Sequence, residues 1–354
     1  MTAKSETSVE LLTPVRERAS INDVARLAGV SAQTVSRVAN GMNNVRPDTR
    51  DRVLAAIKEL QYRPNSAARN LKAGRFRSIG VVTFDLSALG NERTLNAVAE
   101  SAAAAGYTTI LLPVANPTES MVVGAFGRLQ EQAVDGLILI MSAEIGSPDE
   151  LQLTAGLPLV IIDSDATQPY TLVDNDQEQG ARLATEHLLS LGHRDIVHIS
   201  GPADSFSSRR RIGAYRQTMA DAGLPARPVL VGDWSAASGL ALGRELATSM
   251  QRPTAVFVAN DQMALGVMHA FHERGLHVPG DVSIVGFDDS EEAAAFWPAL
   301  TTVHQHFDTV GQSATNSLIA MIDGGPAPKN TLVPTRLVVR DSTGPAPAAA
   351  PTPL

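Results

Sequence analysis

The sequence predicts a small all-α domain near the N-terminus, built as a helix-turn-helix, followed by a larger α/β region with two lobes. Residues 20–40 carry the helix-turn-helix pattern, and short apolar strands alternate with amphipathic helices from Ser78 onward. The charge also changes sign along the chain: residues 1–76 contain 13 Lys and Arg against 7 Asp and Glu, whereas the remainder contains 16 against 30. A basic head on an acidic body is typical of a nucleic-acid-binding module joined to a domain of another function.

The helix-turn-helix begins with a capping signal. Ser20 and Asp23 have the spacing of a capping box, which predicts that a first helix starts at Ile21. Gly29 ends this helix because a residue without a Cβ permits a tight turn, and Ser31 caps a second helix. The residues of the second helix that are expected to face outward are Ala32, Gln33, Thr34, Ser36, Arg37 and Asn40.

A third amphipathic helix over 48–60 is expected to close a small core. Val53, Leu54, Ile57 and Leu60 recur there at helical spacing. Short polar donors at the start of the second helix are suited to contact base edges and phosphates in the major groove of DNA. The alternative is a polar helical hairpin with no ligand, which the third helix and the basic charge disfavour.

Three segments lack the pattern of a folded element. Residues 1–17 are expected to form a disordered arm, and residues 342–354, rich in Pro and Ala, a disordered tail. Residues 64–76 form a hinge of mainly small and basic residues, in which Leu71 is a large apolar side chain. This hinge is either a plain linker or a single helix that is marginally stable alone.

The α/β region alternates strands and helices. Strands are expected at 79–84, 108–113, 136–141, 159–163, 196–200, 255–259 and 283–287, and helices near 92–105, 119–133, 177–191, 208–223, 236–250 and 261–274. This alternation predicts parallel sheets covered by helices on both faces. Because the region spans about 265 residues, two similar lobes are expected rather than one sheet.

The composition excludes several classes of protein. The absence of cysteine rules out disulfides, thiolate catalysis and cysteine-bound zinc. No run approaches the ~18 apolar residues needed to span a bilayer, and the first twenty residues lack a signal-peptide core. We therefore expect a cytoplasmic protein with no membrane partner.

An α/β enzyme is one alternative function. No nucleophile elbow, phosphate-binding loop or dinucleotide-binding glycine motif follows a predicted strand. The eight histidines are scattered, no partner suggests a metal, and His193 is expected to be structural. We therefore expect no catalytic residue, no cofactor and no metal.

Polar residues follow three of the predicted strands. Asp163, the pair Asn260 and Asp261, and the pair Asp288 and Asp289 stand at strand ends, where parallel sheets bind ligands. Asp and Asn also cap helices. We expect Asp261 to be a cap, and Asn260 and Asp288 to contact a ligand.

Several separated motifs, in one order, resemble those of the lactose-repressor family of bacterial transcription regulators over residues 18–341. They are Val-Ser-Ala-Gln-Thr-Val-Ser-Arg-Val-Ala-Asn (30–40), Leu-Gly-His-Arg (191–194), Gly-Asp-Trp-Ser-Ala-Ala-Ser-Gly (232–239), Val-Ala-Asn-Asp-Gln-Met-Ala-Leu-Gly (258–266), Val-Gly-Phe-Asp-Asp (285–289) and Pro-Ala-Leu-Thr-Thr-Val (298–303). The resemblance implies a DNA-binding domain over 18–63 and, after the hinge, a sensor domain over 77–341 that is similar to periplasmic sugar-binding proteins. In such a domain the chain crosses between lobes three times. The implied lobes are an N-lobe of about 77–174 and 304–334, and a C-lobe of about 175–303 and 335–341.

The resemblance also implies which residues contact DNA. Gln33 and Thr34 lie where the family reads bases. The residues implied to contact the operator or its backbone are Ser31, Ser36, Arg37, Asn40 and Asn44. Leu71 matches the apolar wedge that the family inserts into the minor groove, and its alternative role is packing within the linker. Ala32 replaces a tyrosine of the family's namesake, so the operator preference at that base step stays open.

In the sensor domain the resemblance implies a sugar site. Trp234 matches the aromatic side chain on which a sugar face packs, although it is alternatively a core residue. The polar groups implied to bind hydroxyls are Arg211, Asn260 and Asp288, and weaker matches are Asp163, Gln305 and Phe307. Ile140 and Phe84 replace polar residues of the namesake, so the N-lobe side of the pocket is expected to be more apolar. Purine-binding relatives have a phenylalanine at the position of Trp234, which argues against a nucleobase ligand.

Together these features imply a homodimeric repressor that binds double-stranded operator DNA and releases it when a small sugar, with a galactoside as the leading candidate, binds between the lobes. The alternatives are another sugar, a phosphorylated sugar, or a ligand that acts as a corepressor. A transport-type sugar-binding protein would need a signal peptide and no basic head.

A dimer is expected rather than a tetramer, because the residues after Asp341 contain four prolines and one leucine and so cannot form a leucine-heptad helix.

Overall fold

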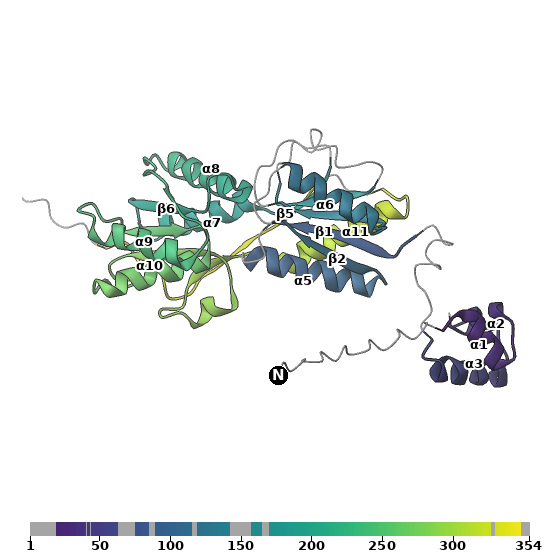
Figure 1. Cartoon of the computed structure of the whole chain (residues 1–354). Helices are drawn as coiled ribbons and strands as arrows, with labels where there is room; N and C mark the ends of the chain where they lie inside the picture. The colour runs from purple at the N-terminus through teal and green to yellow at the C-terminus, as the bar shows by residue number, and fades with distance from the viewer. Residues whose placement is uncertain are drawn as a thin grey trace, which may run out of the picture. The chain divides into compact units, whose positions relative to one another are not determined.

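The chain divides into two compact units, residues 1–75 and 76–354. The computed structural model, drawn in Figure 1, describes residues 19–39, 41–42, 44–62, 75–84, 89–114, 119–141, 157–164, 170–326 and 330–347. The predicted arm, Asn40, Leu71, most of the hinge and residues 348–354 lie outside the described residues.

The first unit contains the helices α1 (Ile21–Ala28), α2 (Ala32–Ala39) and α3 (Pro47–Glu59). Both halves of the predicted capping box are present: the Asp23 amide donates to Ser20 Oγ, and the Ser20 amide donates to Asp23 Oδ2. Gly29 ends α1 in the left-handed region, with φ 65°, which glycine adopts without steric penalty. The predicted start, turn and second helix are confirmed.

The core of this unit is formed by small and β-branched residues from all three helices, namely Val24, Ala25, Ala28, Val35, Val38, Val53 and Ala56. The prediction that Leu54 belongs to this core is wrong, because 48% of its surface is exposed. Ala56 is buried instead, and Ile57 and Leu60 pack at the edge of the cluster. Helix α3 also starts one residue earlier than predicted, since Pro47 fits the first turn of a helix.

The second unit contains two six-stranded sheets. The first has the strand order β11-β5-β4-β3-β1-β2, and all its neighbouring strands are parallel. Its strands are β1 (Ser78–Thr83), β2 (Thr108–Pro113), β3 (Gly136–Ile140), β4 (Leu159–Ile162), β5 (Thr171–Asn175) and β11 (Asn330–Val333). One face packs on α5 (Leu89–Ala104) and α11 (Phe307–Ile322), and the other on α6 (Glu119–Glu131).

The second sheet has the order β12-β10-β9-β8-β6-β7, and only the β10–β12 pair is antiparallel. Its strands are β6 (Ile196–Ser200), β7 (Leu230–Val231), β8 (Ala255–Val258), β9 (Ser283–Asp288), β10 (Thr301–His304) and β12 (Arg336–Val338). Helices α7 (Gln177–Ser190) and α8 (Phe206–Asp221) cover one face, and α9 (Ala236–Thr248) and α10 (Asp261–Glu273) cover the other. The predicted two-lobed α/β architecture with helices on both faces is confirmed.

The chain passes between the two lobes three times: from β5 to α7, from β10 to α11, and from β11 to β12. Hydrogen bonds tie these crossings together. The His306 amide donates to Asn175 Oδ1 over 2.9 Å, and the Thr335 amide donates to Gln179 Oε1 over 2.7 Å. The crossings therefore form one connected strip between the two lobes.

Helices α9 and α10 lie unusually close because both carry glycine at their contact. A Cβ on Gly266 would overlap the backbone of Ala236 and Leu240, and a Cβ on Gly239 would overlap the backbone of Met263. These two glycines end the motifs 232–239 and 258–266. The motifs therefore include a packing requirement for the start of both helices, where Trp234 and Asn260 are located.

Residues 342–347 belong to the fold, so the predicted tail starts too early. Ser342 is fully buried, accepts from the Thr301 amide and donates to the Ile284 carbonyl. His193 Nε2 lies 3.1 Å from the carbonyl oxygen of Gly344 and 3.0 Å from Ser283 Oγ. The predicted structural role of His193 is therefore confirmed: its buried imidazole links the 342–347 segment to the second sheet.

None of the described helices has a long enough apolar stretch to cross a membrane.

Candidate functional site

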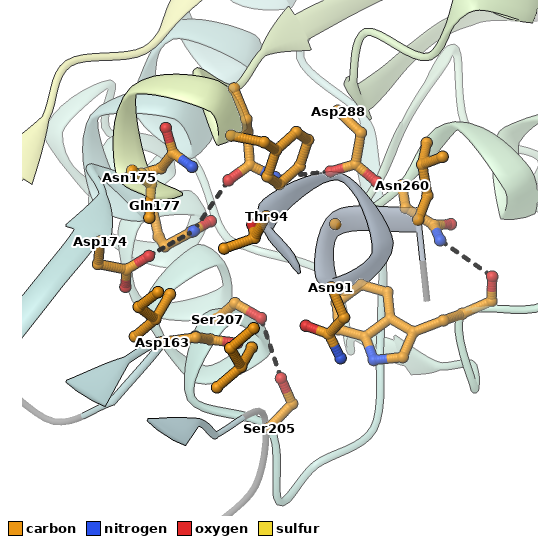
Figure 2. A pocket seen from close by; sticks show the side chains of 18 of the residues that line it. Asn91, Thr94, Asp163, Asp174, Asn175, Gln177, Ser205, Ser207, Asn260 and Asp288 are labelled. Atoms are coloured by element: carbon orange, nitrogen blue, oxygen red, sulfur yellow. Dashed lines mark hydrogen bonds between the residues drawn. The ribbon is translucent and has the colours of Figure 1, made fainter. Parts of the chain in front are cut away.

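A cavity lies between the two lobes of the second unit, where the carboxyl ends of β3, β4, β5 and β9 meet the first turns of α5, α8 and α11. Figure 2 shows polar side chains from both lobes around this space. It is lined by Leu89, Gly90, Asn91, Thr94, Ile140, Ile162, Asp163, Asp174, Asn175, Gln177, Ser205, Ser207, Arg211, Trp234, Asn260, Asp288, Gln305, Phe307 and Val310. All seven residues that the sequence selected as ligand contacts are in this set, although they come from separate segments between positions 163 and 307.

Arg211 is the central cation of the cavity and is buried. Its Nε and Nη2 atoms donate to Gln177 Oε1 over 3.0 and 2.7 Å, and Nη1 donates to the Ala259 carbonyl. The guanidinium also stacks on Phe287, with its Cζ atom 3.7 Å from the ring centroid. Arg211 is therefore held in one orientation before any ligand arrives.

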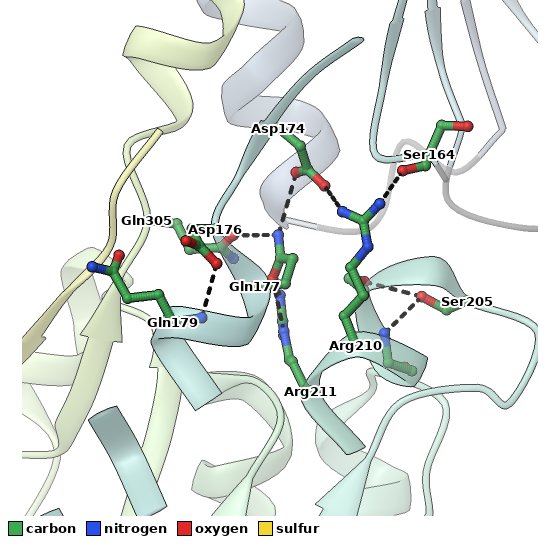
Figure 3. Close-up of polar contacts among 11 residues, drawn as sticks. Ser164, Asp174, Asp176, Gln177, Gln179, Ser205, Arg210, Arg211 and Gln305 are labelled. Atoms are coloured by element: carbon green, nitrogen blue, oxygen red, sulfur yellow. Dashed lines mark hydrogen bonds and ion pairs between the residues drawn. The ribbon is translucent and has the colours of Figure 1, made fainter. Parts of the chain in front are cut away.

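Gln177 joins this cation to the carboxylates. Its Nε2 donates to Gln305 Oε1 over 3.0 Å (Figure 3), and Gln305 Nε2 donates to Asp288 Oδ1 over 2.6 Å. Gln177 opens α7 and Gln305 follows β10, so the chain of bonds runs along two of the crossings between lobes. Sequence reasoning missed Gln177, although its position directly after the polar run Asp174-Asn175-Asp176 was a usable signal.

Asp288 is buried at the end of β9. Burial raises the pKa of its carboxyl to about 6, while the charge of Arg211 and the bond from Gln305 oppose that rise. Asp288 Oδ1 is therefore bonded within the protein by Gln305, and the carboxyl also lines the cavity.

Trp234 lies on the loop between β7 and α9, with a φ of 71°. Its indole ring packs over Gly201, where a Cβ would overlap the ring. The Trp234 carbonyl accepts from Asn260 Nδ2 over 2.9 Å. The ring is partly buried against the second-lobe core and also lines the cavity, so it combines the two roles that the sequence left open.

Asn260, rather than Asp261, caps α10: its Oδ1 accepts from the Met263 amide over 2.9 Å. Asp261 accepts from the Ser290 amide and from Thr302 Oγ1, which ties α10 to β10, and it does not line the cavity. The expectation that Asp261 is the cap is wrong. Asn260 lines the cavity and is also engaged within the protein through both ends of its amide.

Two further carboxylates come from the first lobe. Asp174 is the penultimate residue of β5 and pairs with Arg210, with 3.0 Å between Oδ2 and Nη1. Arg210 also donates to the Ser164 carbonyl, so this arginine of α8 bridges from the second lobe to the first (Figure 3). Asp163 follows β4, and its Oδ1 is buried without a hydrogen-bond partner among the described residues. Burial raises the pKa of Asp163 to about 8, with a further contribution from Asp174.

Three of the seven predicted residues, Asp163, Trp234 and Asp288, have positive φ values of 56°, 71° and 112°. Non-glycine residues rarely adopt this region, and such strain is retained mainly where a particular side-chain position is required. At these three positions of the cavity, an uncommon backbone conformation and a polar or aromatic side chain occur together.

The first-lobe wall contains apolar side chains, including Ile140, Ile162 and Val310, and Phe307 closes one end. Ile140 is where the sequence placed it. Phe84 is not, because it packs against the first-lobe core and does not line the cavity. The sequence also missed the start of α5, which contributes Asn91 and Thr94.

The described residues contain no group of three or more His, Asp or Glu side chains that could hold a metal ion. His304 Nδ1 instead lies 2.8 Å from Asp289 Oδ2, and Asp289 Oδ1 accepts from Arg340 Nη2. This group fixes the second crossing between lobes and does not line the cavity.

In the first unit, Gln33 is exposed at the start of α2, and Ser31 Oγ accepts from the Thr34 amide while its hydroxyl lies 3.0 Å from that of Thr34. Ser36 and Arg37 are half-buried, and Asn44 is exposed in the loop before α3. The N-terminal turn of α2 therefore offers polar groups on the surface, as groove binding requires.

Comparison with known proteins agrees with both units. Residues 20–65 match the model of bacterial regulatory proteins of the lacI family, and residues 185–343 match that of a periplasmic binding protein-like domain. The lactose operon repressor of Escherichia coli (strain K12) is 35% identical over 327 residues, which cover 92% of this chain and 90% of that protein. The repressor PurR of Salmonella arizonae is 37% identical over 86% of this chain and 90% of that protein.

Solved structures of similar proteins also align with this chain over most of its length. A crystal structure of the Lac repressor dimer bound to operator and the anti-inducer ONPF aligns with a TM-score of 0.87 at 34% identity, covering 93% of this chain and all of that chain. The regulator CelR in complex with cellobiose aligns with a TM-score of 0.69 at 33% identity, covering 92% of this chain and all of that chain.

A helix-turn-helix unit joined to a two-lobed domain with a polar cavity defines the class of DNA-binding regulators that respond to a small molecule. The chain belongs to the lacI family of bacterial regulatory proteins. It is accordingly a DNA-binding transcriptional repressor and not an enzyme.

Proposed function

We propose that this repressor binds operator DNA as a homodimer and that a sugar, with galactosides as the first candidates, binds in the interlobe cavity and lowers operator affinity. The observation that carries the proposal is the cavity itself. It combines planar polar groups from Arg211, Asn260 and Asp288 with the indole face of Trp234. Sugars present hydroxyl edges and an apolar C–H face, so they can satisfy both kinds of surface at once.

In this proposal the DNA contacts come from the exposed end of α2 and its flanks. Gln33 and Thr34 read bases, and Leu71 is the minor-groove wedge. The residues proposed to contact the operator or its backbone are Ser31, Ser36, Arg37, Asn40 and Asn44. A repressor that binds operator DNA acts where the bacterial chromosome lies, so the proposed location is the cytoplasm.

Coupling between the two sites is proposed to run through the lobe angle. Gln177 and Gln305 sit at two crossings between the lobes and are bonded to Arg211 and Asp288. A ligand that bonds to residues of both lobes favours one angle between them, and a dimer can transmit that angle to its two DNA-binding units. Such coupling is typically worth about 1–3 kcal/mol.

Trp234→Ala is expected to lower sugar affinity by roughly tenfold to a hundredfold, because the aromatic face contributes on the order of 1–3 kcal/mol. Operator binding without sugar should be unchanged, since the DNA-binding unit is untouched. Calorimetry against a panel of mono- and disaccharides identifies the sugar and measures the loss. Val231→Ala, at an exposed position of the same lobe, is the control and should bind like wild type.

If no sugar binds, or if Trp234→Ala binds the sugar as tightly as wild type, the proposed site is wrong. If Trp234→Ala instead unfolds at a clearly lower temperature and represses poorly without sugar, Trp234 acts as a core residue.

A further inference from the structure

The start of α8 joins the two lobes at a place other than the three crossings of the chain. Phe206, the first residue of this second-lobe helix, is buried in an apolar cluster whose other buried members all lie between positions 82 and 172, in the first lobe. Arg210 follows four residues later, so both side chains leave the same face of α8. One apolar and one polar contact therefore dock the start of α8 on the first lobe.

The polar contact is made by the guanidinium of Arg210. Its Nη1 donates to Asp174 Oδ2 over 3.0 Å, and its Nη2 donates to the Ser164 carbonyl (Figure 3). Asp174 stands in β5 shortly before a crossing, whereas Ser164 follows the neighbouring strand β4. A planar guanidinium that bonds to two acceptors fixes their positions relative to its own helix. Arg210 therefore holds two strand ends of the first lobe against α8.

The same turn of α8 forms part of the cavity wall. Ser205 and Ser207, on either side of Phe206 in the sequence, line the cavity, and Asp174 lines it from the first lobe. With the lobes held at this angle, the cavity measures about 100 Å³. Pockets for small molecules typically measure about 300–1,000 Å³, so a sugar needs a wider cavity. Because these walls belong to different lobes, a larger angle between the lobes provides that space and separates Arg210 from its two acceptors.

We propose that Phe206 and Arg210 form an interlobe latch that opposes sugar binding and favours the lobe angle that binds operator. This inference rests on the proposed function, in which a sugar in the cavity lowers operator affinity. Contacts that must break before the cavity widens raise the free energy of the sugar-bound state relative to the sugar-free state. By linkage, contacts that favour the sugar-free angle also favour operator binding. The latch thus sets how much sugar is needed to release the operator.

Arg210→Met tests the latch, because methionine is also unbranched but has neither the charge nor the two donors. The full-length protein is titrated by calorimetry with galactose, lactose, glucose and cellobiose. Fluorescence anisotropy measures its affinity for a duplex enriched from random-sequence DNA. Arg216→Met is the matched control, since Arg216 is an exposed residue of the same helix and its loss changes the net charge equally. Arg210→Lys is the conservative variant, which keeps the charge and loses the planar fork.

We expect Arg210→Met to bind the sugar at least fivefold more tightly than wild type, and to release operator at a correspondingly lower sugar concentration. Its operator affinity without sugar should equal that of wild type or be weaker. Arg210→Lys should lie between wild type and Arg210→Met, and Arg216→Met should behave like wild type. Removal of a merely structural contact would weaken sugar binding, so a gain in affinity distinguishes the latch from such a role.

If circular dichroism shows that Arg210→Met does not fold, Arg210→Lys carries the test and should bind the sugar at least twofold more tightly than wild type. Sugar affinity that is unchanged or weaker in the folded variant overturns the latch while the cavity remains a sugar site. Tighter operator binding by that variant without sugar overturns it as well. If none of the four sugars binds to wild type or to the variants, the proposed function is wrong, and the latch with it.

Discussion

Replacement of Arg211 by methionine is expected to abolish effector binding and to lower the free energy of unfolding by about 3–5 kcal/mol. The reason is that one side chain serves several partners. Its loss leaves Gln177 Oε1 and the Ala259 carbonyl without donors in a buried place. It also removes the charge that holds down the pKa of Asp288, so that carboxyl should take up a proton more readily. Urea unfolding followed by circular dichroism measures the stability, and calorimetry measures the sugar affinity.

Arg209→Met is the matched control. Arg209 is the exposed neighbour of Arg211 on the same helix, and its guanidinium donates to the Asp204 carbonyl. Its loss should change stability by less than about 0.5 kcal/mol, as surface substitutions usually do. Equal effects of the two substitutions would contradict the central role of Arg211.

Gly266→Ala is expected to be the most damaging of the small substitutions, with a loss of about 1–3 kcal/mol or more in the free energy of unfolding. The added methyl group would overlap the backbone of Ala236 and Leu240. A side chain could relieve such an overlap by changing its rotamer, but a helix backbone cannot. The helices α9 and α10 must then separate, which moves Trp234 and Asn260 at their N-terminal ends. We therefore expect sugar affinity to fall together with stability.

Gly213→Ala provides the comparison, because Gly213 is also in a helix and its added Cβ would meet no atom within 4 Å. Alanine is favoured over glycine in a helix by up to about 1 kcal/mol, so this variant should be as stable as wild type or more stable. Thermal unfolding of both variants distinguishes the cases. If Gly266→Ala is as stable as Gly213→Ala, the claim that α9 and α10 pack too closely to admit a Cβ at Gly266 is wrong.

The parts of the fold that could be predicted from sequence are those with a strong local signal. Ser20, Asp23 and Gly29 fix the first helix and its turn through caps, which depend on few neighbours. The buried strand β3 is a continuous apolar run, and the buried strand β9 contains the apolar run Ile-Val-Gly-Phe between Ser283 and Asp288. By contrast, α11 was not predicted. Its sequence includes Gly311, which allows α11 to pack closely on the backbone of α5. That contact cannot be inferred from the sequence alone.

The same distinction applies to the site. Trp234 and Asp288 were predictable because each follows a strand or a turn and belongs to a recognisable motif. Gln177 was missed although it directly follows a polar run, because a glutamine at the start of a helix looks like an ordinary surface residue until the fold brings it against Arg211. The cap of α10 was assigned to Asp261 instead of Asn260 for a similar reason. Either side chain can cap α10, and the choice depends on Thr302 and Ser290, which are distant in sequence.

The central claim is that a sugar in the interlobe cavity controls DNA binding by the first unit. The most direct measurement is fluorescence anisotropy with a duplex that the full-length protein enriches from random-sequence DNA, titrated in the absence and presence of the sugar found by calorimetry. We predict that saturating sugar weakens the affinity of wild type for this duplex by at least about tenfold, and that the same sugar concentration has much less effect on Trp234→Ala. An affinity that does not change when the cavity of the wild-type protein is saturated with sugar would contradict the account.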